Sequence, residues 1–142
     1  MTIKRKASAH WEGGLKDGRG SISTDSGALD AYPYGFASRF EGMKGTNPEE
    51  LLGAAHSGCF TMALSLVLGE AGFTAEAMDT SAVVSLDQVD GGFAITKVVL
   101  TLRAKIPGID DETFQKCAAG AKANCPLSKV INAEIELDAA LV

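Results

Sequence analysis

Three side chains on one predicted helix combine groups that thiol chemistry needs. Cys59 lies within an apolar segment, and His56 precedes it by three residues, so both point to the same side of a helix. Glu49 lies close to three helical turns before Cys59 and falls near the same face. A free cysteine in an apolar helix is usually a small core residue. Burying polar groups beside it costs free energy, so the strip predicts a functional site.

A second cysteine has its own claim to reactivity. Cys125 precedes Pro126, which favours the first position of a helix, so Cys125 is the expected N-cap of a short helix. At that position the helix dipole stabilises a thiolate, and on this ground alone Cys125 is itself a candidate attacking thiol. Cys117 lies in an Ala-rich segment without polar neighbours and is expected to be part of the core.

Peroxide reduction is one chemistry that two thiols in a small chain can carry out. A thiolate that attacks an O–O bond needs a lowered pKa, a cation beside it and a second thiol that converts the sulfenic acid to a disulfide. Arginine suits the role of the cation, because it stays protonated and its planar group can bridge a thiolate, a peroxide oxygen and a carboxylate. Spacing alone does not choose among the arginines, which are Arg5, Arg19, Arg39 and Arg103.

Composition and motifs argue against several other classes. The net charge of −5 and the pI of about 5.0 disfavour a nucleic-acid partner, and the only basic cluster is Lys4-Arg5-Lys6. The cysteines and histidines lack metal-ligand spacing, so we expect no metal. The chain has no nucleotide-binding fingerprint, so we expect no organic cofactor either. The three cysteines, an odd number without a secretory signal, favour a reducing cytoplasm. Polar residues interrupt the apolar segment 51–68, which favours a core helix over a membrane span.

The pattern of elements predicts a single domain, residues 1–142, of the α+β class with antiparallel sheet, because it has no alternating βαβ units. A helix is expected from Asn47 to about Leu68, with Asn47 as cap and Pro48 at the first position. Its apolar residues lie on nearly every side, which indicates that a partner subunit covers part of it. The other expected elements are strands at 3–11, 19–24, 34–40, 77–86, 93–104 and 134–141, and helices at 111–123 and from 126 to 131.

Several of these residues occur in stretches that resemble the OsmC/Ohr family, and specifically its OsmC branch, over residues 2–141. The family comprises osmotically inducible and organic hydroperoxide resistance proteins, which act in osmotic and oxidative stress. The stretches are Tyr34-Gly35-Phe36 with Arg39-Phe40-Glu41-Gly42, Gly45 to Leu51, Ala54-Ala55-His56 with Cys59 to Leu64, and Cys125-Pro126-Leu127-Ser128.

The resemblance implies a fold, an activity and a set of roles. The fold is an intertwined homodimer with antiparallel sheets around long central helices and two active sites at the subunit interface. The implied activity is that of a Cys-based peroxidase that reduces organic hydroperoxides, and hydrogen peroxide more weakly, with a lipoyl or other dithiol as reductant. Cys59 matches the peroxidatic thiol, Cys125 the resolving thiol and Glu49 the carboxylate that orients the family's arginine. Arg39 is the first match for that arginine.

Arg19 lies in Gly18-Arg19-Gly20, which resembles the Gly-Arg loop of the Ohr branch, and it stays open as the second match. Arg19, His56 and Phe60 are the expected substrate-binding residues. Two other functions also stay open at this point. One is a non-catalytic binding or structural dimer with packing cysteines, and the other is Cys-His acyl transfer by Cys59 and His56, for which no orienting Asp or Asn is evident.

Overall fold

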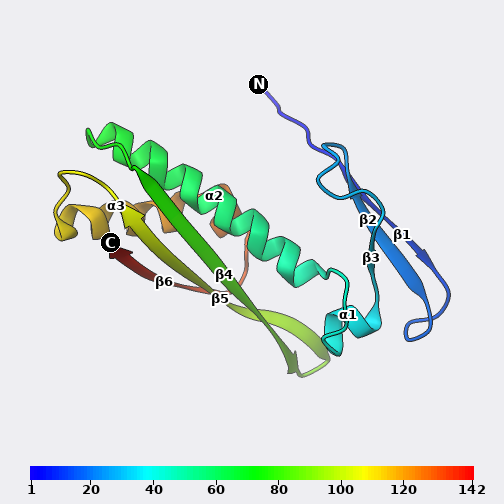
Figure 1. The fold of residues 1–142 in the computed structure, drawn as a ribbon. Helices are drawn as coiled ribbons and strands as arrows, with labels where there is room; N and C mark the ends of the chain where they lie inside the picture. The colour runs from blue at the N-terminus through cyan, green and yellow to red at the C-terminus, as the bar shows by residue number, and fades with distance from the viewer. The chain divides into compact units, whose positions relative to one another are not determined.

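The computed structural model describes all residues from Met1 to Val142, and they form two compact units, Met1–Pro48 and Glu49–Val142 (Figure 1). We refer to them as the N-terminal unit and the C-terminal unit, and each is described by itself. The single domain expected from the sequence therefore stays a prediction.

The N-terminal unit is built around a small antiparallel sheet of β1 (Ala7–Glu12), β2 (Arg19–Thr24) and β3 (Tyr32–Tyr34). Gly20 of β2 lies opposite Tyr34 in the sheet. A Cβ atom at this position would lie 2.4 Å from the Tyr34 ring and 2.6 Å from the Trp11 ring. Glycine is therefore required where the two aromatic side chains close over the strand.

The strand predicted over residues 34–40 is wrong beyond Tyr34, because Phe36–Phe40 forms the short helix α1. The even spacing of Phe36 and Phe40 fits one face of a strand. A spacing of four residues satisfies the helical period as well, and their ring centroids are 4.9 Å apart on the helix. The backbone N–H of Gly35 donates to the Ser38 hydroxyl, which closes the first turn at 2.9 Å.

The C-terminal unit contains one long helix, two shorter helices and the second sheet. In chain order the elements are α2 (Pro48–Glu70), β4 (Ala77–Val89), β5 (Gly92–Lys105), α3 (Asp111–Asn124), α4 (Pro126–Val130) and β6 (Glu134–Leu141). The predicted long helix, the hairpin of β4 and β5 and the later elements are confirmed to within a few residues. Glu49 and Glu50 occupy the first turn of α2, where the negative charge of a carboxylate interacts favourably with the helix dipole.

One part of the predicted sheet topology needs correction. β4 and β5 pair antiparallel, as expected, but β5 and β6 pair parallel, so this sheet is mixed, in the order β4-β5-β6. The physical reason is the connection between β5 and β6, which contains α3 and α4. A crossover of that length returns the chain to the same end of the sheet, whereas a tight turn forces antiparallel pairing. The α+β class itself is confirmed.

The core of the C-terminal unit lies between the helices and one face of this sheet. Alternate residues of β5 point into it, as the period of a strand requires. From α2 the buried side chains follow one stripe at spacings of three and four residues. The largest fully buried side chains are Phe60, Leu64 and Leu68 from α2, Val98, Leu100 and Leu102 from β5, and Phe114 from α3.

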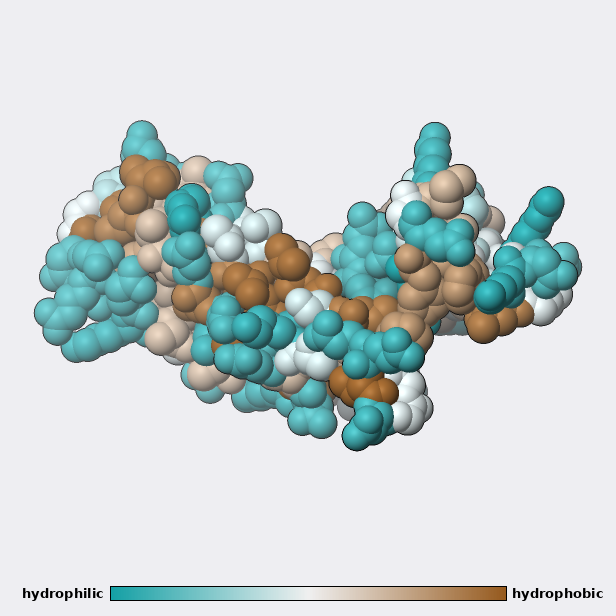
Figure 2. Space-filling model, turned by 90° about the horizontal axis from the view of Figure 1, so that it is seen from below, coloured by the Kyte–Doolittle hydropathy of each residue, from teal (hydrophilic) through white to brown (hydrophobic).

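The opposite face of α2 is apolar yet exposed. Met62 retains 76% and Leu66 retains 65% of its accessible surface. By length and composition α2 could cross a membrane, but the core helix of a soluble protein meets the same test. One stripe of α2 is buried against the core, and 28% of its apolar window is buried within the chain. The space-filling view shows apolar side chains at the surface between hydrophilic ones (Figure 2).

Candidate functional site

The thiols of Cys59 and Cys125 lie close enough to hydrogen-bond to each other. Cys59 comes from the middle of α2, and Cys125 is the N-cap of α4, as the sequence predicts. Two residues that lie 66 positions apart in the chain thus meet because α4 begins beside α2. Both are free thiols in this structure. The contact provides the pair that a dithiol–disulfide cycle requires.

The two thiols differ in access. Cys125 is fully buried, at 0% exposure, whereas Cys59 is partly exposed. A substrate that arrives from solvent therefore reaches Cys59 first. This difference favours Cys59 as the attacking thiol over Cys125, which is a candidate on the ground of its N-cap position alone.

The surroundings of the two sulfurs shift their pKa values in opposite directions. Burial raises the pKa of Cys59, and the neighbouring Cys125 raises it further, while the backbone N–H of Leu127 opposes both effects. For Cys125, burial raises the pKa, but hydrogen bonds from the hydroxyl and backbone N–H of Ser128, and from Cys59, outweigh it, so that the pKa is lowered. In the reduced pair, the negative charge is therefore favoured on Cys125.

Ser128 is a site residue to which sequence reasoning gave no role. Its backbone N–H donates to Cys125 Sγ at 3.3 Å, and its hydroxyl oxygen lies 3.3 Å from the same sulfur. The available signal was capping geometry, because the third residue of a helix presents its N–H to the side chain of the N-cap. With Cys125 as N-cap, that residue is Ser128.

His56 contacts Ser128 through its imidazole ring. It is fully buried, and its Nε2 is 2.8 Å from Ser128 Oγ. The bond to Ser128, not to Cys59, occupies the ring, which removes support for the acyl-transfer alternative. Phe60 is also fully buried, within the core. The burial of both side chains gives no support to the role in substrate binding expected for His56 and Phe60.

Glu49 is buried at the start of α2, where its role in orienting an arginine stays a prediction, and two of the four arginines interact elsewhere. Glu49 lies in the first turn of α2 and is only 8% exposed, which is unusually buried for a carboxylate. Arg103 pairs with Asp138 at 3.3 Å, and Arg5 donates to the backbone carbonyl of Lys4. Arg19 and Arg39 belong to the N-terminal unit, whereas the thiols belong to the C-terminal unit. Their pairing with Cys59 stays a prediction.

Arg39 lines a pocket of its own unit. The pocket has a volume of about 210 Å³, and its other walls include Trp11, Tyr34, Phe36 and Phe40. The guanidinium of Arg39 lies 5.3 Å from the centre of the Phe40 ring, within cation–π range. An aromatic pocket that contains one cation suits a ligand with an apolar body and a polar end.

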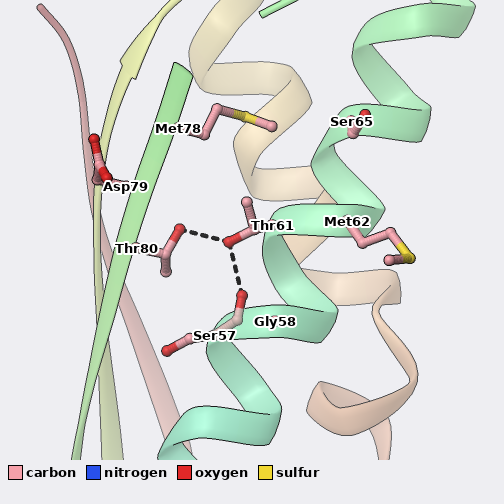
Figure 3. A pocket seen from close by; sticks show the side chains of 8 residues that line it. All are labelled: Ser57, Gly58, Thr61, Met62, Ser65, Met78, Asp79 and Thr80. Carbon is pink, nitrogen blue, oxygen red and sulfur yellow. Dashed lines mark hydrogen bonds between the residues drawn. The ribbon is translucent and has the colours of Figure 1, made fainter.

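A larger open pocket, of about 620 Å³, lies between α2 and β4 (Figure 3). Thr61 lines this pocket, and the Thr61 hydroxyl donates to the Ser57 carbonyl at 2.7 Å and lies 2.6 Å from the Thr80 hydroxyl. No cysteine, histidine or basic residue lines this pocket, so it lacks the groups that the thiol chemistry uses. No group of three His, Cys, Asp or Glu side chains is arranged to bind a metal ion. Cys117 is buried at 7% exposure in the core, as predicted.

Comparisons of the sequence with known proteins point to one family. The family model described as OsmC-like protein matches residues 41–140. Peroxiredoxin OsmC of Escherichia coli is 62% identical over 138 residues, which cover 97% of this chain and 96% of that protein. Organic hydroperoxide resistance protein OhrB of Bacillus subtilis is 33% identical over 120 residues, covering 83% of this chain and 85% of the relative.

The fold agrees with solved structures of such proteins. The crystal structure of an organic hydroperoxide resistance protein from Elizabethkingia anophelis, with crystallant-derived thiocyanate bound, superposes with a TM-score of 0.76 at 29% identity and covers 100% of both chains. The residues matched by the family model, 41–140, include the whole of α2 and the turn at Cys125. With a family model that spans most of the chain and a relative at 62% identity, this protein belongs to the family of OsmC-like proteins.

Proposed function

We propose that this protein is a thiol peroxidase that reduces organic hydroperoxides to alcohols, and hydrogen peroxide more weakly. The observation that carries the proposal is the contact between two free thiols of which only Cys59 reaches the surface. The names of two relatives support it, since one is a peroxiredoxin and the other an organic hydroperoxide resistance protein.

The proposed cycle has two halves. The Cys59 thiolate attacks the terminal peroxide oxygen, the O–O bond breaks, and the alkoxide takes a proton to leave as an alcohol. Cys59 is then a sulfenic acid, which the Cys125 thiolate attacks to form a disulfide, and the hydroxide takes a proton to leave as water. A lipoyl or other dithiol reduces the disulfide by exchange, so two electrons pass from the dithiol to the peroxide.

The attack requires a cation that the C-terminal unit does not bring to Cys59. Burial and the neighbouring Cys125 raise the pKa of Cys59, the Leu127 backbone lowers it, and the net effect is a raised pKa. We assign the missing charge to Arg39, oriented by the buried Glu49, with Arg19 as the second candidate. The aromatic pocket beside Arg39 supports this choice, because it would take the organic group of the peroxide while the guanidinium meets the peroxide oxygens.

A homodimer is part of the proposal, and so is a cytoplasmic location. The exposed apolar face of α2 contains Ala54, Ala55, Met62 and Leu66 and needs a cover in water. A second copy of α2 would supply one, as the family resemblance implies. The free thiols suit a reducing compartment.

The dimer leads to a prediction at Leu66. Leu66→Asp introduces a charge into the face that would be buried between two α2 helices, so we expect the molar mass measured by light scattering to fall to that of one chain. Lys116→Gln is the matched control, because it changes the net charge equally at an exposed position of α3 and should leave the mass unchanged. A dimeric Leu66→Asp variant would rule out α2 as the dimer contact.

The proposed function is tested by mapping the cysteines after a single oxidation. We expect one equivalent of cumene hydroperoxide to convert the reduced protein to a Cys59–Cys125 disulfide, identified by mass spectrometry of peptides without reduction. Cys117 should remain a free thiol. An unreacted protein, with the peroxide recovered intact, would favour the non-catalytic dimer instead.

A further inference from the structure

A continuous line of hydrogen bonds joins a buried histidine to the resolving thiol. His56 Nε2 lies 2.8 Å from Ser128 Oγ, which lies 3.3 Å from Cys125 Sγ. The histidine comes from α2, Ser128 from α4 and Cys125 from the N-cap of α4, so the line crosses the contact between two elements. A buried imidazole is a costly residue for simple packing, which calls for a reason for its presence.

The surroundings of His56 determine the direction of these bonds. Its Nδ1 is buried and has no hydrogen-bond partner. Burial lowers the pKa of His56, so the ring is neutral and carries one N–H. If that N–H were on Nδ1, it would be a buried donor without an acceptor, which is costly. With the proton on Nε2, the ring donates to Ser128 Oγ, and the hydroxyl hydrogen of Ser128 is free to point at Cys125 Sγ.

We propose that His56 and Ser128 are positioning residues that stabilise Cys125 as the leaving thiolate when the Cys59–Cys125 disulfide is reduced. His56 holds the Ser128 hydroxyl in the donating orientation, and this hydroxyl joins the Ser128 backbone N–H on the sulfur. Hydrogen bonds to a charged acceptor are the strong ones, so the arrangement favours the negative charge on Cys125. The inference deepens the proposed function, since it uses the disulfide that the peroxidase cycle forms.

The consequence is a direction for the reductive step. A dithiol thiolate attacks the sulfur of Cys59, which is the accessible one. A bond forms between the dithiol sulfur and Cys59, the disulfide bond breaks, and its electron pair passes to Cys125 Sγ. A leaving thiol of lower pKa leaves faster, so the relay accelerates this step. The second dithiol sulfur then releases Cys59.

The test follows the reductive step alone and uses no peroxide. The disulfide of the full-length protein is formed with diamide, and its reduction by dithiothreitol is followed by quenching and mass spectrometry. Ser128→Ala removes the hydroxyl donor but leaves the backbone N–H, and we expect reduction to slow by a factor of about ten or more, the value of a charge-assisted hydrogen bond. Ser128→Thr retains a hydroxyl and should recover most of the rate. Ser65→Ala, at an exposed position of α2, is the matched control.

Two further readouts separate positioning from general structure. The Cys125 thiolate, followed by its ultraviolet absorbance in a Cys59→Ser background, should titrate at higher pH when Ser128 is alanine. His56→Leu should slow reduction as Ser128→Ala does, and the double variant should be no slower than the single ones, because both act through one line of bonds. Equal reduction rates for Ser128→Ala and Ser65→Ala would overturn the relay. Because diamide forms the disulfide, this result is independent of whether the wild-type protein consumes peroxide.

Discussion

Cys59→Ser is expected to lose organic hydroperoxide reduction by about a thousandfold or more, because no other group can supply the attacking sulfur. A serine hydroxyl is not ionised at neutral pH and does not form a sulfenic acid. Cys125 remains in this variant, but it is fully buried and cannot replace Cys59 at the surface. The measurement is the steady-state rate of cumene hydroperoxide loss with dithiothreitol as reductant.

Cys117→Ala serves as the control for Cys59→Ser. Cys117 lies in the core on α3 and makes no contact that the cycle uses, so the variant should keep the wild-type rate. Its loss of one buried sulfur should lower stability only modestly. Retention of full turnover by Cys59→Ser would exclude Cys59 as the peroxidatic thiol and would return the N-cap thiol Cys125 to that role.

The fold was largely predictable where local signals agreed with one another. At the start of α2, Asn47, Pro48 and the two glutamates that follow all favour a helix N-terminus, and the helix begins there. Gly91 has a positive φ at the turn between β4 and β5, as a tight hairpin requires. Prediction failed where the signal was ambiguous or non-local. The even spacing of Phe36 and Phe40 fits a strand and a helix alike, and the parallel partner of β5 is chosen by tertiary contacts.

The candidate site was predictable in part. The cysteines were identified by their local settings, and Cys125 as N-cap followed from Pro126. The contact between the two sulfurs could not be predicted, because it depends on how α4 packs beside α2. For the same reason, sequence analysis placed His56 in a polar strip on α2 but could not show that its partner is Ser128. Periodicity places a residue on the face of one element, whereas pairs from different elements are fixed only by packing.

Cys125→Ser is expected to consume one equivalent of hydroperoxide and then stop. The attack by Cys59 does not use the Cys125 sulfur, so the sulfenic acid forms, but no second thiol is in contact to convert it to a disulfide. After this burst, excess peroxide should slowly oxidise the Cys59 sulfenic acid to sulfinic acid with a second equivalent, and dithiols do not reverse that step. The fold should persist, since serine is a favoured N-cap and can accept the Ser128 N–H in place of the thiol. Stopped-flow consumption of cumene hydroperoxide measures the burst, and peptide masses locate the added oxygen.

The two cysteine variants together decide the order of events. If Cys59 attacks, Cys59→Ser gives no burst and Cys125→Ser gives a burst equal to the protein concentration, with oxygen added to Cys59. If Cys125 attacked, the two outcomes would exchange places. Access favours the first arrangement, because Cys125 has no exposed surface while Cys59 is partly exposed. Sustained turnover by Cys125→Ser would show that the reductant resolves the sulfenic acid directly, and the contact between the two thiols would then have no part in the cycle.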